Sequence, residues 1–126
     1  MVTHPVKLTL VPAEGLLLGN NGRYEKFIAD LAGLYRDEAA YSGALAADDG
    51  KPVYWVESSH TEPGEGGLIT GISVLEPGRV GEEFAMTRGH IHANHGYSEL
   101  YSCLAGHGVM LLETIDGRSE DRKSVV

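Results

Sequence analysis

The sequence has one cysteine, few aromatic residues and few positive charges. Cys103 alone cannot form an intrachain disulfide, which fits a reducing compartment. Ten Lys and Arg residues against eighteen Asp and Glu residues give a net charge of −8. An acidic surface repels nucleic acid and anionic lipid, so we expect neither as a partner. An anionic small molecule would need a pocket rich in hydrogen-bond donors.

Long hydrophobic runs are also missing. The first twenty residues contain short apolar stretches that are broken by Pro5, Lys7, Pro12 and Glu14. They hold no signal-peptide core, and no run reaches the length of a transmembrane helix. The sequence therefore predicts a cytoplasmic protein. Its 126 residues are enough for one domain with a hydrophobic core.

The N-terminal part predicts a strand, a helix and a loop. Residues 6–11 alternate weakly and predict the strand, and residues 39–50, rich in Ala, Gly and Asp, predict the loop. Between them we expect a short amphipathic helix that begins after an asparagine cap and ends at Gly33. Its apolar residues at helical spacing are Tyr24, Phe27, Ile28, Leu31 and Tyr35.

From residue 53 onward the pattern changes to short strands separated by glycine-containing turns. Such spacing favours an antiparallel β-sandwich or barrel. We expect residues 1–50 to form the N-terminal section, 51–118 the barrel strands and 119–126 a tail. The predicted strands are residues 53–59, 68–76, 82–92, 99–106 and 108–114.

Two histidines and a glutamate form the most informative pattern. His90 and His92 are one residue apart, so in a strand they project to the same side. Residues 93–98 form a loop that returns the chain to Glu99. Two imidazoles and a carboxylate suit a divalent first-row metal such as iron, manganese, nickel or zinc. The plainer interpretation is a pair of surface histidines, and Glu99 with Gly106 seven residues later argues against it.

HxH, a glutamate and then a glycine resembles the first cupin motif. The long loop before the glutamate resembles the archaeal-type, cupin-fold glucose-6-phosphate isomerases in particular. The stretches VLEPGRVGEEFAMTRGHIHA and ELYSCLAGHGVMLLET resemble that family's central block, and DLAGLYRDEAAY and PVYWV resemble its N-terminal block. The resemblance covers about residues 28–118 and implies an all-β cupin barrel with a short N-terminal helix, acting on a sugar phosphate as a homodimer.

The resemblance also implies roles for individual residues. His90, His92 and Glu99 would be metal ligands, with iron as the first choice. Thr87 and Gly89 would hold the sugar phosphate, and Ser73 stands where the family usually has threonine. The remaining substrate-binding residues that the resemblance implies are Tyr54 and Tyr101, the latter on the same expected strand face as Glu99.

Each of these residues also has a purely structural interpretation. Thr87 suits any strand, and Gly89 suits a β-bulge. Tyr54 and Tyr101 would serve equally well as core aromatics. We expect Arg88 to be a solvated strand residue rather than a phosphate ligand. The remaining candidates are expected at the surface or in the core: His60 and His107 in surface turns, His95 in an exposed loop with a weak claim to substrate contact, and Cys103 as a small core residue.

The chemistry that the resemblance implies is the transfer of one hydrogen between C1 and C2 of an open-chain sugar. A metal that binds both oxygens would stabilise their developing charge. Glu99 is the candidate base that carries the proton through a cis-enediol. A carboxylate that also binds a cation is a poorer base, so either Glu99 shifts when sugar binds or the hydrogen moves as a hydride. The sequence leaves both routes open.

A second cupin motif, whose histidine completes the metal site, does not occur in this sequence. We expect a C-terminally truncated chain, with strand exchange between two copies, or replacement of the ligand by His107, His60 or water, as alternatives. The expected function is a metal-dependent glucose-6-phosphate isomerase of central carbohydrate metabolism. The alternatives are a non-catalytic cupin that binds a sugar phosphate or metal, and another metal-dependent cupin enzyme.

Overall fold

The computed structural model describes residues 7–61, 66–94, 96–114 and 116–125, with side chains described up to residue 118. The chain divides into two compact units, Met1–His90 and Ile91–Val126. A single cupin domain over residues 1–126 stays a prediction. Within the described residues, none of the helices is long and apolar enough to cross a membrane.

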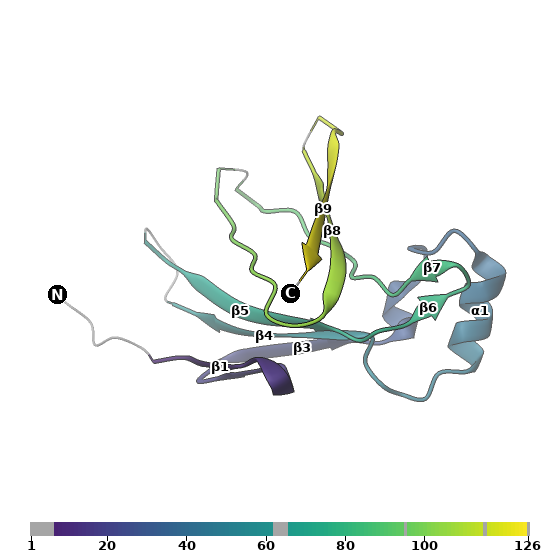
Figure 1. Ribbon diagram of the computed structural model, residues 1–126, viewed down its shortest axis with the longest axis horizontal. Coiled ribbons are helices and arrows are strands. Elements are labelled where there is room, and N and C mark those ends of the chain that lie inside the picture. The colour runs from purple at the N-terminus through teal and green to yellow at the C-terminus, as the bar shows by residue number, and fades with distance from the viewer. Residues whose placement is uncertain (1–6, 62–65, 95, 115, 126) are drawn as a thin grey trace. The chain divides into compact units, whose positions relative to one another are not determined.

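Strands make up most of the regular structure, as the sequence predicts for an all-β fold with a short helix. Among the residues that the structure describes, the first unit contains three antiparallel sheets and the second contains one hairpin (Figure 1). The elements are β1 (Thr9–Val11), η1 (Pro12–Glu14), β2 (Leu16–Leu18), β3 (Gly22–Lys26), η2 (Ile28–Leu31), α1 (Glu38–Ala46), β4 (Tyr54–His60), β5 (Ile69–Leu75), β6 (Arg79–Val80), β7 (Glu83–Phe84), β8 (His107–Glu113) and β9 (Ser119–Val125).

The central sheet of the first unit has the order β3-β4-β5, and Figure 1 shows the three strands side by side. Tyr24, Val56 and Ser73 lie directly opposite one another in its register. Directly opposite residues share a face of a sheet, and so do alternate residues of one strand. Tyr54 therefore lies on the same face as Ser73. This confirms the predicted strands at residues 53–59 and 68–76.

The other face of this sheet contacts β2 of the β1–β2 hairpin. Gly15 has φ = +63° between the two strands, and a Cβ built there would lie 2.5 Å from Val74 Cγ2. Its carbonyl accepts a hydrogen bond from Trp55 Nε1 at 3.2 Å. Leu17 is fully buried. The left-handed turn thus lets a buried leucine and the tryptophan hold the hairpin to the sheet.

The hydrophobic core of the first unit joins the sheet to the helical segments. Tyr41 and Ala44 of α1 pack against this core from outside. Tyr41 also donates a hydrogen bond from its hydroxyl to the Ile28 carbonyl at 2.9 Å. The buried members of this core are Ile28, Leu31, Tyr35, Tyr54 and Val80.

The helix lies later in the chain than the sequence analysis expected. Tyr24 belongs to β3, whose five residues pair with β4, and Ile28–Leu31 form only a 3-10 turn. The α-helix is Glu38–Ala46, which begins one residue before the expected loop of residues 39–50 and otherwise lies within it. Asp37 caps it by accepting a hydrogen bond from the Ala40 N–H at 2.9 Å. The cap and the alanine-rich sequence favour a helix there, while sheet pairing outweighs helical spacing at β3.

Two predicted strands are wrong over most of their length. In residues 82–92 only Glu83–Phe84 pair, with β6. Residues 99–106 contain no strand in the described structure. An alternating pattern allows an extended chain, but a strand also needs a neighbouring strand to pair with, and beyond Glu83–Phe84 the structure describes no such strand pairing in either segment.

The second unit contains the hairpin β8–β9. The predicted strand at residues 108–114 is confirmed as β8, which pairs antiparallel with β9 over seven residues. Residues 119–126, expected as a tail, include β9. Their sequence, SEDRKSVV, lacks alternating apolar residues and gave no sign of a strand.

Candidate metal centre

His90, His92 and Glu99 lie together within ten consecutive residues. One nitrogen from each histidine and one carboxylate oxygen of Glu99 all lie within 4.8 Å of one another. His90 and Glu99 are exposed, and His92 is partly buried. Within the described part of the chain this group has three members. His60 and His107, expected as alternative sources of a fourth ligand, are not among them.

A loop, rather than a pair of strands, brings the three side chains together. Residues 90–94 and 97–100 have no regular secondary structure, so the expected projection of both histidines from one strand is wrong. The turn is closed by Asn94, whose carbonyl accepts a hydrogen bond from the Tyr97 N–H at 3.1 Å. The Asn94 side chain accepts another from the Gly96 N–H at 2.9 Å. Asparagine is suited to such turns, which return the chain toward Glu99.

His92 is contacted at both ring nitrogens. Nδ1 lies 3.3 Å from the Tyr97 carbonyl oxygen, and Nε2 lies 3.1 Å from Glu99 Oε2. Both partners are acceptors, so a neutral ring can donate to only one of them, from Nδ1 or from Nε2. A metal ion held by Nε2 and Glu99 would fix the ring hydrogen on Nδ1, where the Tyr97 carbonyl can accept it.

The donor set fits a divalent metal ion. A histidine that binds metal through one nitrogen commonly donates a hydrogen bond from the other, often to a backbone carbonyl, which fixes the tautomer. The Tyr97 carbonyl is placed to do this for His92. Two imidazoles and one carboxylate match the ligand preferences of iron, manganese, nickel and zinc. The three residues would hold the ion and leave further coordination positions for other oxygens.

Tyr54 and Ser73, two of the expected substrate-binding residues, lie on one face of the β3-β4-β5 sheet. Tyr54 is 5% exposed and belongs to the core. Its hydroxyl accepts a long hydrogen bond of 3.5 Å from the Arg88 N–H, and its ring meets Tyr24 edge-on at 6.4 Å between centroids. Ser73 is exposed. Tyr54 thus packs in the core, Ser73 is accessible, and their roles in substrate binding stay predictions.

Thr87 and Gly89 flank Arg88 in an exposed segment without regular secondary structure. Gly89 has φ = +71°, a backbone conformation that favours glycine. Arg88 is exposed, but it is not the strand residue that the sequence analysis expected. Its guanidinium donates hydrogen bonds to the carbonyls of Asp30 and Ala32. This contact between residues distant in sequence was not visible in the motif.

The remaining candidates have less defined surroundings. Tyr101 is 47% exposed and lies outside any strand, so its expected alignment with Glu99 on one strand face is wrong. Cys103 is exposed rather than a core residue. His60 ends β4 instead of lying in a turn, with Nε2 2.8 Å from Ser58 Oγ, and His107 begins β8 in an exposed position. His95 lies outside the described residues.

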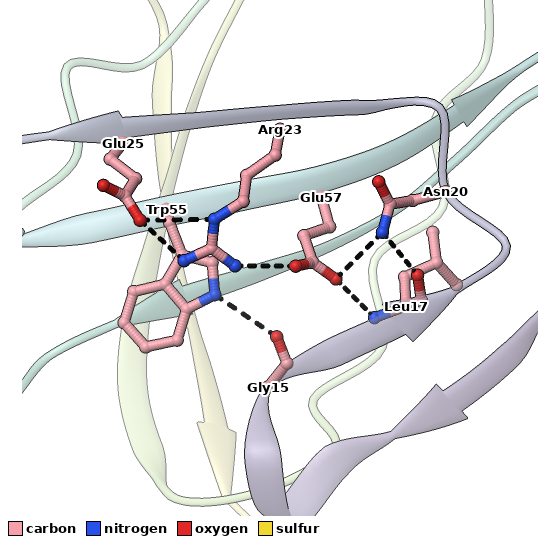
Figure 2. Close-up of polar contacts among 7 residues, drawn as sticks. All are labelled: Gly15, Leu17, Asn20, Arg23, Glu25, Trp55 and Glu57. Atoms are coloured by element: carbon pink, nitrogen blue, oxygen red, sulfur yellow. Dashed lines mark hydrogen bonds and ion pairs between the residues drawn. The ribbon is translucent and has the colours of Figure 1, made fainter.

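The sequence analysis missed a charged network on the opposite face of the central sheet (Figure 2). Glu57 is buried, and its carboxylate accepts hydrogen bonds from the Leu17 N–H and from Arg23 Nη1, both at 2.6 Å. Arg23 also pairs with Glu25 at 2.6 Å. These donors lower the pKa of Glu57, the Leu17 N–H most and Arg23 next. The signal was an opposite-charge pair directly across two strands, Arg23 and Glu57.

Comparison with known proteins gives one consistent result. Residues 25–126 match the family model described as "Glucose-6-phosphate isomerase (GPI)". "Putative glucose-6-phosphate isomerase 2" of Rhizobium meliloti (strain 1021) is 46% identical over 105 residues, which are 83% of this chain and 52% of that protein. "Glucose-6-phosphate isomerase" of Sinorhizobium medicae (strain WSM419) is 41% identical over 82% of this chain and 48% of its own length.

An archaeal relative aligns over more of the chain. "Glucose-6-phosphate isomerase" of Thermococcus kodakarensis (strain ATCC BAA-918 / JCM 12380 / KOD1) is 37% identical over 116 residues, which are 92% of this chain and 60% of that protein. The chain spans about half the length of the first two of these curated relatives. The aligned part of each therefore corresponds to a portion of the relative.

Proposed function

Because this chain belongs to the archaeal-type, cupin glucose-6-phosphate isomerase family, we propose that it carries the metal centre of an enzyme that interconverts glucose 6-phosphate and fructose 6-phosphate. The observation that carries the proposal is the grouping of His90, His92 and Glu99, whose ligand atoms lie within 4.8 Å of one another. The contact between His92 Nδ1 and the Tyr97 carbonyl supports it, because a histidine that binds metal through one nitrogen commonly donates to a backbone carbonyl from the other.

The metal we propose is iron, with manganese, nickel and zinc as the alternatives that a metal titration would compare. When bound, a divalent ion acts as a Lewis acid toward the oxygens on C1 and C2 of the open-chain sugar. His90 and His92 would hold it as neutral ligands. Glu99 supplies a negative charge, which favours a divalent cation in a site where two of the three ligands are uncharged.

Glu99 is the proposed base of the isomerisation. Starting from fructose 6-phosphate, its carboxylate would take a proton from C1 and return it to C2, while the hydroxyl proton moves from O1 to O2, the former carbonyl oxygen. The intermediate is a cis-enediol, and atoms and electrons balance without another reactant. The alternative is direct transfer of the hydrogen from C1 to C2. Incorporation of solvent deuterium at C2 of the product supports the first route, and its complete absence supports the second.

The phosphate-binding residues remain proposals from the family resemblance. They are the hydroxyls of Tyr54, Ser73, Thr87 and Tyr101 with the backbone of Gly89. The Tyr54 hydroxyl accepts from the Arg88 N–H, so its own hydrogen is available to a phosphate oxygen. Hydroxyl and backbone donors suit a dianion in a chain whose net charge is −8, because they bind it without a basic patch.

We propose further that the protein acts as a cytoplasmic homodimer. Family resemblance is the main support, and phosphorylated sugars of central carbohydrate metabolism are the expected substrates. Val109 and Leu111 of β8 expose 62% and 68% of their surface, which is consistent with an association partner. Light scattering at several protein concentrations tests this, and a monomer throughout would contradict it.

The test of the proposed function is direct. The purified protein is incubated with fructose 6-phosphate and added iron or manganese, and glucose 6-phosphate is measured. Turnover that is lost in His90→Ala but kept in His107→Ala supports the proposal. Binding of fructose 6-phosphate without turnover supports the alternative of a non-catalytic cupin. Turnover that is independent of His90, His92 and Glu99 would exclude this metal centre.

A further inference from the structure

We propose that Arg88 is a positioning residue, which fixes the Thr87–Gly89 segment to the 3-10 helix η2 so that the segment can receive the substrate phosphate. The inference rests on the proposed function and adds a specific role to it. The arginine does not neutralise the phosphate. Its charge is directed at backbone carbonyls, and it acts through the segment that it holds.

The guanidinium of Arg88 donates hydrogen bonds to two backbone carbonyls. Nη2 donates to Asp30 O at 3.0 Å and to Ala32 O at 2.9 Å, and Nε donates to Asp30 O at 3.3 Å. These carbonyls belong to the last turn of η2 and the residue after it, where backbone acceptors have no partner within the helix. A planar guanidinium can satisfy two such acceptors at once, which a single ammonium group does less well.

The acceptor side of this contact is firmly held. Ile28 and Leu31 of η2 are buried in the same core cluster as Tyr54. The Asp30 carboxylate accepts a hydrogen bond from the Phe27 N–H at 2.9 Å, which fixes the start of the turn. An anchor on a packed turn restrains the attached segment more than an anchor on a mobile loop would. Arg88 thus connects an exposed segment to the core.

A second contact reaches the same core from the backbone. The Arg88 N–H lies 3.5 Å from the Tyr54 hydroxyl. The side chain and the main chain of Arg88 are therefore both tied to elements of one cluster, η2 and β4. Open space surrounds the position where a Cβ of Gly89 would lie, so the segment is accessible from outside. A restrained but accessible backbone is suited to binding an anion through its N–H groups.

The two roles for Arg88 predict different results with lysine. If Arg88 acted as a phosphate ligand, a lysine would keep the charge and much of the affinity. If it acts through the hydrogen bonds of its guanidinium to two carbonyls, Arg88→Lys should lose as much affinity for the substrate as Arg88→Gln. Arg36→Gln is the matched control, because it removes the same charge from a side chain that is 92% exposed and lies 3.7 Å from Glu83.

The experiment compares steady-state kinetics with fructose 6-phosphate for the parent protein, Arg88→Lys, Arg88→Gln and Arg36→Gln. We expect KM to rise about tenfold in both Arg88 variants, with kcat changed less than about threefold, since the lost restraint affects phosphate binding before chemistry. Arg36→Gln should match the parent. Metal content and thermal unfolding of each variant are measured in parallel and should stay unchanged.

Two kinetic results would overturn the inference. One is recovery of the parental KM by lysine, which would make Arg88 a direct ligand of the phosphate. The other is a parental KM in both Arg88 variants. Backbone amide exchange of a peptide covering residues 86–90 gives a reading that needs no activity, and we expect faster exchange in both Arg88 variants than in Arg36→Gln. If the parent protein has no isomerase activity, the proposed function fails, and amide exchange alone decides whether Arg88 fixes the segment.

Discussion

At the scale of single residues, His92 has a contact at each ring nitrogen that bears on how it could bind a metal ion. Its Nδ1 faces the Tyr97 carbonyl and its Nε2 faces Glu99. A metal ion on Nε2 would fix the ring hydrogen on Nδ1, where the Tyr97 carbonyl can accept it. The loop that carries Glu99 thus also carries the acceptor that a metal-binding His92 would use.

The first prediction concerns this residue. His92→Ala should weaken binding of manganese or iron at least about 100-fold, because it removes one of three proposed ligands and the partner of Glu99. Isothermal titration calorimetry measures the change. His107→Ala is the control, since His107 is exposed and lies outside the ligand group. Equal metal affinity of the His92 variant and the control would show that these side chains hold no ion.

Glu57 is the residue whose ionisation is most closely tied to folding. Its pKa lies below the ordinary value near 4.3, because the Leu17 N–H and Arg23 favour the carboxylate. A carboxyl with a depressed pKa contributes stability above the pKa of the unfolded chain. That contribution is lost as the pH falls through the pKa of the folded state.

The second prediction follows from the lowered pKa of Glu57. Glu57→Gln should lower the free energy of unfolding at pH 7 by about 1–2 kcal/mol, a value reduced by the partial exposure of Arg23. The difference from the parent should begin to shrink as the pH falls through the ordinary carboxyl pKa, and it should be lost once the folded-state carboxyl is protonated, because both proteins then carry a neutral side chain. Urea unfolding at a series of pH values measures it. A difference that stays constant from pH 7 to pH 3 would contradict the assignment.

At the scale of elements, α1 depends on its first turn. The Asp37 side chain accepts the Ala40 N–H, and the Arg36 and Asp37 N–H groups contact Glu83 of β7 at 2.9 and 3.4 Å. Tyr41 of the same helix stacks on Tyr35 with 5.9 Å between ring centroids. The cap therefore sets the position at which the helix begins to pack on the core.

The third prediction tests this cap. Asp37→Ala should destabilise the protein by about 1 kcal/mol, while Asp37→Asn, which retains an acceptor oxygen, should cost only a few tenths. Thermal unfolding monitored by circular dichroism distinguishes the two. If both variants were equally destabilised, the charge of Asp37 rather than its capping hydrogen bond would be the important property.

Strand pairing in the β3-β4-β5 sheet places two groups of residues on opposite faces. β4 and β5 bring Tyr54 and Ser73 to one face of the sheet, while Arg23 and Glu57 occupy the other. Figure 2 shows that this second face is joined to the β1–β2 hairpin through Leu17 and Gly15. The face that carries the candidate substrate residues is therefore separate from the one that holds the hairpin in place.

At the scale of the whole molecule, metal binding and stability should be linked. An ion that binds the folded chain and not the unfolded one stabilises it by about 2.7 kcal/mol when the free metal is one hundred times its Kd. The three proposed ligands all lie in residues 90–99. Metal should therefore protect the segment that contains them, and a chelator should reverse the effect.

The fourth prediction is that excess manganese raises the unfolding temperature of the parent by about 5 °C or more. It should leave a His90→Ala/His92→Ala double variant unchanged. Differential scanning calorimetry with and without a chelator gives the comparison. A similar rise in the double variant would indicate binding elsewhere in the acidic chain.

The sequence alone determined which side chains make up the candidate metal site. The spacing of His90, His92 and Glu99 defines a loop short enough to close, and the structure brings their ligand atoms together as expected. The strands β4, β5 and β8 were also predicted, since alternating side chains and turn residues are local signals. Helix α1 was missed although its signal, an aspartate cap before alanines, is local too.

Only the tertiary structure decided the partners of Arg88 and Glu57, and only it showed that the described residues 85–92 and 97–104 form no strand. Arg88 reaches a carbonyl 56 residues away, and Arg23 reaches a carboxylate 34 residues away. Spacing within a short segment is fixed by covalent geometry and can be read directly. Hydrogen bonds between distant segments depend on how whole elements pack, which no short stretch of sequence specifies.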